Sequence, residues 1–294
     1  MGTRKYKVEL RDEIRITAEF ESENCPVRAR TGSSVEIIDF HAHIYPDKIA
    51  EKASQATGDF YGITPAHSGT AEELLASGKA AGISRFVLLP VATKPDQVRH
   101  INEFIADEVS KHNEFYGFGT LHPDCKNILE ETEHIISLGL KGIKLHPDTQ
   151  QFNTDDKRLF EVFDYIQGRI PLLVHCGDKR FDFSHPRRLK NVIDNFHHLQ
   201  VIAAHLGGWS LFDEAFELMK DESSYLDISS TMMFLPPELV RHYIHGYGAD
   251  RILFGTDFPL WNPEQEVESF KRLNLSSDEF ERIAYKNALE ILNV

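Results

Sequence analysis

Cysteine is scarce in this 294-residue chain, and long apolar runs are missing from it. The three cysteines, Cys25, Cys125 and Cys176, are far apart and form no Cys-x-x-Cys motif, so we expect a reducing compartment and no disulfide framework. No apolar segment approaches the length of about 20 residues that spans a bilayer, and the charged N-terminus lacks the apolar segment of a signal peptide. The sequence therefore predicts a soluble cytoplasmic protein.

Basic residues are outnumbered by acidic ones, 32 against 46, which gives a formal net charge of −14. This balance argues against nucleic acid and against an anionic membrane surface as partners. The apolar content is ordinary, so a large core can form. The length suits one α/β barrel or two smaller domains.

Residues 1–34 differ from the rest of the chain. Apolar residues alternate with polar ones in two short arms that flank residues 11–13; they are Tyr6, Val8 and Leu10, then Ile14, Ile16, Ala18 and Phe20. Such alternation is typical of strands, and we predict a β-hairpin extension over residues 1–34, with a floppy tail as the alternative. The main domain would then span residues 35–294.

From residue 35 onward, short strand-like runs recur about every 25–35 residues, with helix-like segments between them. The eight runs are 35–41, 85–89, 115–121, 141–145, 170–174, 200–204, 224–228 and 251–255. Helices are predicted over 96–112, 155–167 and 278–292, the last with Ser277 and Asp278 as caps. Eight such units predict a TIM (β/α)8 barrel. An open doubly wound sheet is the alternative, but no Gly-x-Gly-x-x-Gly follows the first strand.

Polar residues gather at the ends of the predicted strands. His41 and His43 end the first strand, and strand alternation places them with Asp39 on one face, about 6–7 Å apart along the strand. Further side chains at strand ends are His122, Lys144 with His146, His175, His205 and Asp257. Any one of them could be a loop residue or a turn former. Together they indicate a shared site, because catalytic groups of barrels converge at the C-terminal strand ends.

Imidazole and carboxylate are suitable ligands for a divalent metal ion. They bind Zn²⁺ at about 2.0–2.2 Å, and a catalytic site leaves one position open for water. The ion lowers the pKa of that water toward about 7, and a nearby carboxylate or histidine can then move protons. The strand-end cluster therefore predicts metal-dependent chemistry.

Five ordered motifs resemble the amidohydrolase superfamily, in the amidohydrolase-related branch that includes aminocarboxymuconate-semialdehyde decarboxylase-like enzymes. They are IDFHAH at 38–43, GLKGIKLHP at 139–147, VHCG at 174–177, AHLGG at 204–208 and LFGTDFP at 253–259, joined by YKNA at 285–288. The resemblance implies a distorted TIM barrel that holds one divalent metal, usually Zn²⁺, with Mn²⁺ as the alternative. It also implies that His41, His43, His175 and Asp257 hold the metal, and that His205 acts as a proton carrier or as a further ligand. In a hydrolytic mechanism, His205 and Asp257 would move protons.

Three further residues are expected near the substrate or behind the ligands: Lys144, His146 and Asp39. Binuclear members of the superfamily bridge two metals with a carboxylated lysine on strand four, where Lys144 lies, but the branch resemblance favours one metal and a free lysine. Lys144 could then hold a substrate carboxylate, or instead pair with Asp39 or Asp227. His146 and His122 could line the pocket or only orient loops, and Asp39 could support the ligands from behind.

Three functions remain open. The first is a metal-dependent hydrolase of a small-molecule amide, lactone or ester. The alternative is a non-oxidative decarboxylase of a small carboxylic acid, which would use the same ligands. A metal-binding barrel without catalysis is the third. The substrate is not readable from the sequence, and homo-oligomerisation stays open, with a dimer as the commonest form.

Overall fold

The computed structural model describes residues 35–294, so the hairpin predicted for residues 1–34 lies outside the described residues. Nine short parallel strands alternate with helices in this part. They are β1 (Ile38–Ala42), β2 (Arg85–Leu88), β3 (Phe115–Gly117), β4 (Gly119–Thr120), β5 (Ile143–Leu145), β6 (Leu172–Val174), β7 (Val201–Ala203), β8 (Tyr225–Asp227) and β9 (Ile252–Leu253). The pairing order is β1-β2-β3 in one sheet and β4 through β9 in sequence in the other.

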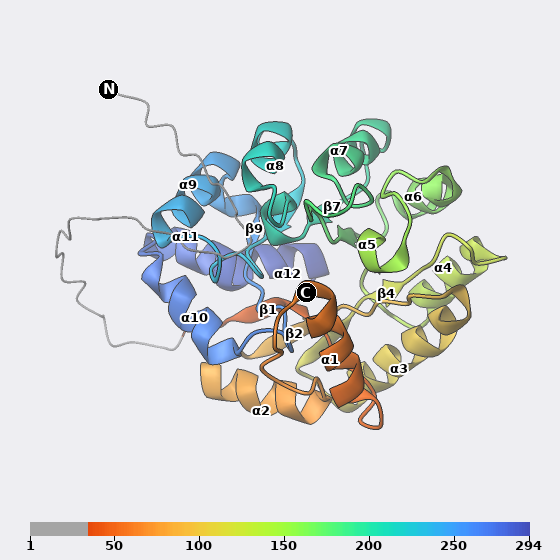
Figure 1. Cartoon of the computed structure of the whole chain (residues 1–294), viewed down its shortest axis with the longest axis horizontal. Helices are drawn as coiled ribbons and strands as arrows, with labels where there is room; N and C mark the ends of the chain where they lie inside the picture. The colour runs from red at the N-terminus through yellow and green to blue at the C-terminus, as the bar shows by residue number, and fades with distance from the viewer. Residues whose placement is uncertain (1–34) are drawn as a thin grey trace. The chain divides into compact units, whose positions relative to one another are not determined.

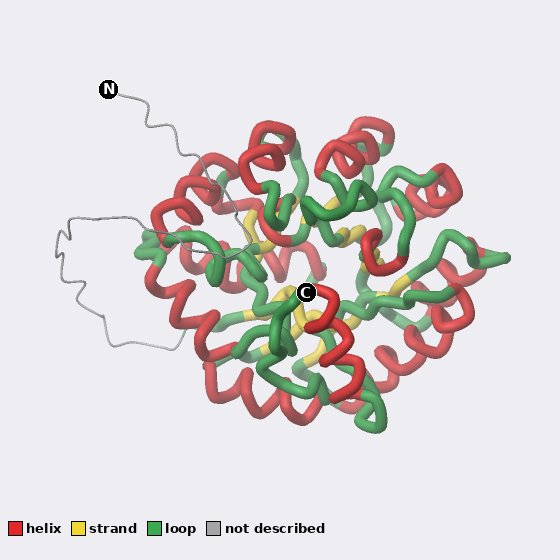
Figure 2. The backbone as a smooth tube through the Cα atoms, viewed as in Figure 1, coloured by secondary structure: helices red, strands yellow, loops and turns green. Residues whose placement is uncertain are grey.

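Backbone hydrogen bonds connect the two sheets at both of their borders. At one border, the N–H of Phe118, which lies between β3 and β4, donates to Leu88 O of β2 at 2.9 Å, while the next residue, Gly119, donates its N–H to Gly142 O beside β5 at 2.8 Å. At the opposite border, the Phe40 N–H donates to Phe254 O at 2.8 Å, so the last strand is joined to the first. The strands therefore follow one another around a ring (Figure 2).

The run 115–121, which the sequence predicts as one strand, is divided at Phe118. The Phe118 ring is buried and meets Phe40 edge to face, with 5.8 Å between the ring centroids. A side chain at Gly119 would collide with Ile135, because a Cβ there would lie 2.6 Å from an Ile135 carbon. Ring packing and close helix approach at these positions interrupt the regular ladder.

Helices surround the strands (Figure 1). They are α1 (Ala50–Tyr61), α2 (Ala71–Ala81), α3 (Val98–Lys111), α4 (Ile128–Ser137), α5 (Pro147–Gln150), α6 (Phe160–Ile166), α7 (Pro186–Asn195), α8 (Phe212–Met219), α9 (Pro237–Tyr247), α10 (Pro263–Arg272), α11 (Ser277–Glu281) and α12 (Asn287–Leu292). The helix predicted over 278–292 is interrupted by a π-helical turn at 282–286. Its predicted caps are wrong by one residue, because Ser276 is the N-cap and forms a capping box with Glu279.

The core has two parts on either side of the strands. Leu173, Ile202 and Leu253 lie in a buried cluster to which α12 contributes Ile291 and Leu292. A larger cluster fills the space between the strands and the surrounding helices. Because strand side chains alternate between the two faces, neighbouring residues such as Leu172 and Leu173 enter different clusters. Within residues 35–294, no helix has the length and apolar character needed to cross a membrane.

Glu266 of α10 is a fully buried carboxyl, and neither of its oxygens has a hydrogen-bond partner. Burial raises its pKa from 4.5 to about 8, and the charges of Asp257 and Asp39 act in the same direction. The folded protein therefore holds a proton here at neutral pH, whereas the unfolded chain releases it.

We expect this proton to make stability fall with rising pH. The contribution of the protonated carboxyl is complete below the unfolded pKa of 4.5 and is lost as the pH rises through about 8, at up to about 1.4 kcal/mol per pH unit. The urea concentration at the unfolding midpoint should therefore depend less on pH in Glu266→Gln than in the wild type between pH 5 and 8.5. At pH 8.5 the midpoint of the variant should be the higher of the two. Glu264→Gln, at an exposed position of the same helix, is the control. An unchanged pH slope in Glu266→Gln would contradict the expectation.

Candidate metal centre and active site

The histidines at the end of β1, His41 within the strand and His43 just after it, are each fixed by an acceptor on their outer nitrogen. His41 Nδ1 lies 2.9 Å from an Asp227 carboxylate oxygen, and His43 Nδ1 lies 2.5 Å from the backbone oxygen of Leu89. A carboxylate and a carbonyl can only accept, so we assign the proton of each neutral ring to Nδ1. The Nε2 lone pairs of His41 and His43 then point into the cluster, where a metal ion can bind, and that of His41 also faces the Lys144 ammonium group at 3.2 Å.

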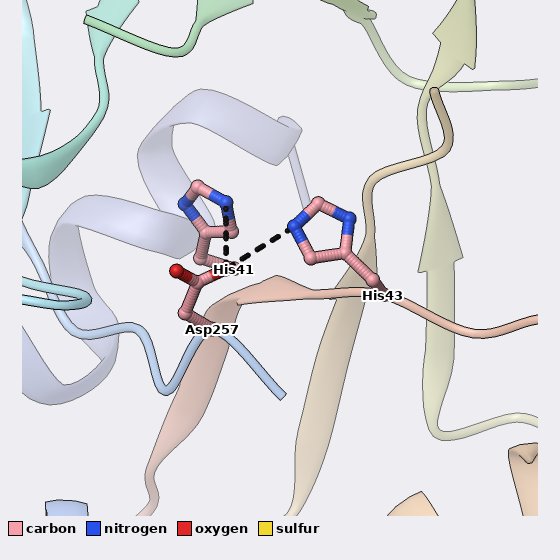
Figure 3. A group of neighbouring side chains, drawn as sticks. All are labelled: His41, His43 and Asp257. Carbon is pink, nitrogen blue, oxygen red and sulfur yellow. Dashed lines mark ion pairs between the residues drawn. The ribbon is translucent and has the colours of Figure 1, made fainter. Parts of the chain in front are cut away.

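Asp257 faces both of these lone pairs. Its Oδ1 lies 3.2 Å from His43 Nε2 and 3.6 Å from His41 Nε2 (Figure 3). Its other carboxylate oxygen accepts a hydrogen bond from the Ser230 hydroxyl, which in turn accepts one from the Trp261 indole. Burial opposes ionisation of Asp257, but positive charge at the neighbouring histidine positions outweighs it and holds the pKa of Asp257 well below the usual value; a cation bound among the histidines would act in the same direction. The carboxylate is therefore charged at neutral pH.

A second pair of histidines shows the same pattern. His205 Nδ1 lies 3.0 Å from the Ser229 backbone oxygen, and His175 Nε2 lies 3.1 Å from the Gly177 backbone oxygen. If both outer nitrogens donate to these carbonyls, two lone pairs face each other, because His205 Nε2 and His175 Nδ1 are only 3.0 Å apart. Burial lowers the pKa of His205 to about 3, so protonation of this ring does not remove the repulsion near neutral pH.

These donors suit a divalent cation. Four imidazoles present inner lone pairs beside one ionised carboxylate, and this mixture of nitrogen and oxygen is what Zn²⁺ and similar ions bind. A cation would also relieve the contacts between lone pairs. Each imidazole is already oriented by a partner on its far side, as ligating histidines almost always are.

The predicted ligands fall into two neighbouring groups of donor atoms. His41, His43 and Asp257 form one group, within 4.8 Å of one another. His175 belongs to a second group with His146 and Asp148. A third group contains His41, His205 and Asp227, so His205 connects the first two groups through His41 and through its contact with His175. The structure thus brings three of the four predicted ligands together directly, and the role of His175 as the fourth stays a prediction.

Lys144 is fully buried beside this cluster. Its Nζ lies 3.2 Å from His41 Nε2, so its hydrogen-bond partner in the described chain is a histidine and not Asp39 or Asp227. Burial lowers its pKa to about 8, although the nearby carboxylates of Asp227 and Asp257 oppose the shift. Most of the lysine therefore remains positively charged at neutral pH.

His146 lies on the far side of His175. The two rings stack with 3.9 Å between their centroids, and His146 Nε2 is 2.7 Å from the hydroxyl of Tyr61, the last residue of α1. His122, by contrast, accepts a hydrogen bond from the Asp124 N–H and packs against Phe152. His146 lines the cavity described below, whereas His122 orients its loop.

Asp39 supports the cluster from behind instead of lining the cavity. One carboxylate oxygen accepts the N–H groups of His41, at 3.0 Å, and Thr256, at 2.9 Å. The other accepts the Thr256 hydroxyl at 2.5 Å. Burial raises the pKa of Asp39 to about 7. The Asp39 side chain therefore joins the backbone of His41 to that of Thr256, the residue before Asp257.

Several members of the site were not predicted. Asp227, which the sequence suggests only as a partner of Lys144, ends β8 and anchors His41; its place at a strand end is the signal it shares with the predicted site residues. Ser229 and Ser230 follow the same strand and bond His205 and Asp257. Tyr61 comes from α1, about 85 positions from the histidine that it contacts. No pattern in the sequence distinguishes these hydroxyl groups from ordinary surface ones.

A cavity of about 640 Å³ opens from the cluster. Its polar lining includes His41, His43, His175, His205 and Asp257, and Lys144 is the one lysine or arginine among the described residues that line it. Aromatic side chains of Phe60, Tyr61 and Trp209 also border it. A volume of this size accommodates a small organic molecule.

The chain belongs to the amidohydrolase family, because the family model described as "Amidohydrolase" matches residues 38–294. A curated relative, "Decarboxylase orsB" of Emericella nidulans, is 28% identical over 166 residues. That match covers 54% of this chain and 44% of the relative's length.

Solved structures share the fold at low sequence identity. An uncharacterised TIM-barrel protein of Bordetella bronchiseptica has a TM-score of 0.74 at 21% identity, over 88% of this chain and 98% of its own. A 5-carboxyvanillate decarboxylase of Sphingomonas paucimobilis has a TM-score of 0.69 at 17% identity, over 89% and 100%. A dihydroxybenzoic acid decarboxylase of a Polaromonas species, with bound manganese and the inhibitor 2-nitroresorcinol, has a TM-score of 0.70 at 17% identity, over 88% and 97%. The predicted TIM-barrel class and superfamily are confirmed.

We expect His43→Ala to weaken metal binding by at least about 100-fold, since loss of outer partners alone costs about 10–100-fold. Titration calorimetry with Zn²⁺ and Mn²⁺ measures the effect, and circular dichroism checks that the barrel is intact. His100→Ala is the matched control, because His100 borders the outer part of the same cavity with a side chain that is 86% exposed. Wild-type affinity in His43→Ala would refute the assigned cluster.

Proposed function

We propose that this chain is a metal-dependent, non-oxidative decarboxylase of a small hydroxylated aromatic acid. The observation that carries the proposal is a buried ammonium group, Lys144, that lines the same cavity as the metal-ligand cluster. The curated relative and two of the structural neighbours bear the name decarboxylase, which supports the alternative of the sequence analysis over its first choice, a hydrolase.

Lys144 would bind the carboxylate of the substrate as a point charge. A buried ammonium gains more from an anionic partner than an exposed one does, because no water screens the pair. The rings of Tyr61 and Trp209, which meet edge to face at 5.3 Å, border the cavity and could pack on an aromatic ring. The ammonium group and the two aromatic rings therefore suit a planar aromatic acid with one carboxylate.

The cation would be held by His41, His43, His175 and Asp257. When bound there, it supplies positive charge for the carboxylate or hydroxyl oxygens of the substrate. We propose one ion per chain. The nitrogen-rich donor set suits Zn²⁺, whereas manganese is the metal named for a neighbour.

Decarboxylation breaks the bond between the ring and the carboxyl carbon, and the electron pair stays on the ring carbon. Carbon dioxide leaves, and that ring carbon takes up one proton. We assign the proton transfer to His205 and Asp257, because His205 is neutral, Asp257 is ionised and both line the cavity. Either group could take the proton of a substrate hydroxyl and return it to the ring.

We expect the metal-loaded protein to release carbon dioxide from 2,6-dihydroxybenzoate or 5-carboxyvanillate without consuming water. In D₂O, mass spectrometry of the product should show one deuterium on the ring carbon that lost its carboxyl group. In H₂¹⁸O, no label should enter the product. Incorporation of ¹⁸O into products of an amide, lactone or ester panel, with no carbon dioxide from the acids, would instead assign a hydrolase. Absence of turnover in both panels would favour a barrel without catalysis.

We expect Lys144→Met to lower kcat/KM for such an acid by about 10–100-fold, because a hydrogen bond to a charged group contributes about 1.5–3 kcal/mol. Lys141→Met is the matched control, since Lys141 precedes the same strand at its other end and does not line the cavity. Steady-state assays of the wild type and both variants, at equal metal content, measure kcat/KM. Equal kcat/KM in both variants would show that Lys144 does not bind the substrate carboxylate.

A further inference from the structure

The cavity that contains the metal-ligand cluster has two ends of different character. The cluster end carries the histidines, Lys144 and Asp257. The other end, where α1 and α3 contribute the lining, is mainly apolar, with Ile49, Ala53, Ala56, Ile101 and Phe104; Thr57 and His100 are its polar members. We name this end the apolar cleft. Figure 1 shows α1 drawn in front of the strands, inside the circle formed by the other helices.

Helical spacing explains why each helix presents one face to the apolar cleft. On α1, the lining residues Ala53, Ala56, Thr57 and Phe60 recur every three or four positions. On α3, the lining residues His100, Ile101, Phe104 and Ile105 also lie three or four positions apart, and the polar one, His100, is 86% exposed at the outer rim. Positions three and four apart lie on the same side of a helix, so the two faces border one continuous space.

These faces retain exposed apolar surface. Ile49, just before α1, is 51% exposed. Ala56 is exposed, and Ala53, Ile101 and Phe104 are only half-buried. Apolar side chains grouped in this way around a cavity mark a site that a ligand covers. The small side chains of Ala53 and Ala56 leave the apolar cleft wide on the α1 side.

We propose that the apolar cleft binds an apolar substituent of the acid substrate, an alkyl chain opposite the carboxyl group, and so selects alkylated hydroxybenzoates over the bare ring. The inference rests on the proposed decarboxylase function. A charged head at Lys144 and a chain between α1 and α3 match the polarity of the two ends. The cavity of about 640 Å³ is suited to a drug-sized ligand, and a dihydroxybenzoate alone is smaller than that.

The test is a series of 2,6-dihydroxybenzoates that carry hydrogen, methyl, propyl, pentyl or heptyl at position 4. Each methylene that enters the apolar cleft should raise kcat/KM about fourfold until the cleft is full, which is the value of one buried CH₂. Dissociation constants from titration calorimetry with the metal-loaded full chain should follow the same series. This second readout does not depend on turnover.

Ala56→Phe should fill the apolar cleft from its exposed side. We expect it to abolish the gain from pentyl and heptyl chains, measured as kcat/KM for each alkylated acid divided by kcat/KM of the same variant for the unsubstituted acid. Gln55→Phe is the matched control, because Gln55 is the exposed neighbour on α1 and does not line the cavity. It should keep the chain-length preference.

The possible results distinguish failure of the cleft proposal from failure of the decarboxylase proposal. Decarboxylation of the unsubstituted acid with no gain from longer chains in either readout overturns the proposed cleft function, and so does an equal effect of Gln55→Phe and Ala56→Phe. A change of oligomeric state in Ala56→Phe by gel filtration would assign the apolar cleft to a second copy of the chain and also overturn it. Tighter binding with chain length but no carbon dioxide from any acid would overturn the decarboxylase function and retain the apolar cleft as a binding site.

Discussion

The orientation of four imidazole rings is the constraint on which the site depends. Each ring is held by an acceptor on its outer nitrogen: Asp227 for His41, and backbone oxygens for His43, His175 and His205. With the outer proton fixed, the inner nitrogen can only offer a lone pair. The protein therefore brings electron donors together at distances that a cation makes favourable. The hydrogen bonds on the outer nitrogens therefore determine which nitrogen of each ring can bind a metal ion.

The same contacts that close the ring of strands also build the cluster. The Asp257 N–H donates to His41 O at 2.7 Å, and Asp39 bonds both the His41 N–H and Thr256. A substitution that disturbs this junction would therefore affect packing and ligand geometry together. Glu266, buried on α10 without a partner, adds a further carboxyl close enough for Asp257 and Asp39 to raise its pKa.

The sequence predicts the parts of this protein that rest on periodicity or on residue type. The alternation of strands and helices suffices to predict the barrel. The order of the polar residues that end the strands suffices to predict that His41, His43 and Asp257 lie close together. The division at Phe118 depends on ring packing between distant strands, which no local pattern records. The same holds for the Tyr61–His146 contact and for the serines after β8, since a hydroxyl group gives no signal of its partner.

The positions of the donors along the chain have a consequence for folding. His41 lies in the first strand, His43 directly follows it, and Asp257 follows the last strand, so an ion shared by them would cross-link the seam where the ring closes. Such an ion binds only the closed form, and its binding energy adds to the free energy of unfolding by mass action. The metal would then cross-link the first and last strands in addition to its part in the chemistry. Removal of the ion would therefore lower stability first at the junction of these two strands.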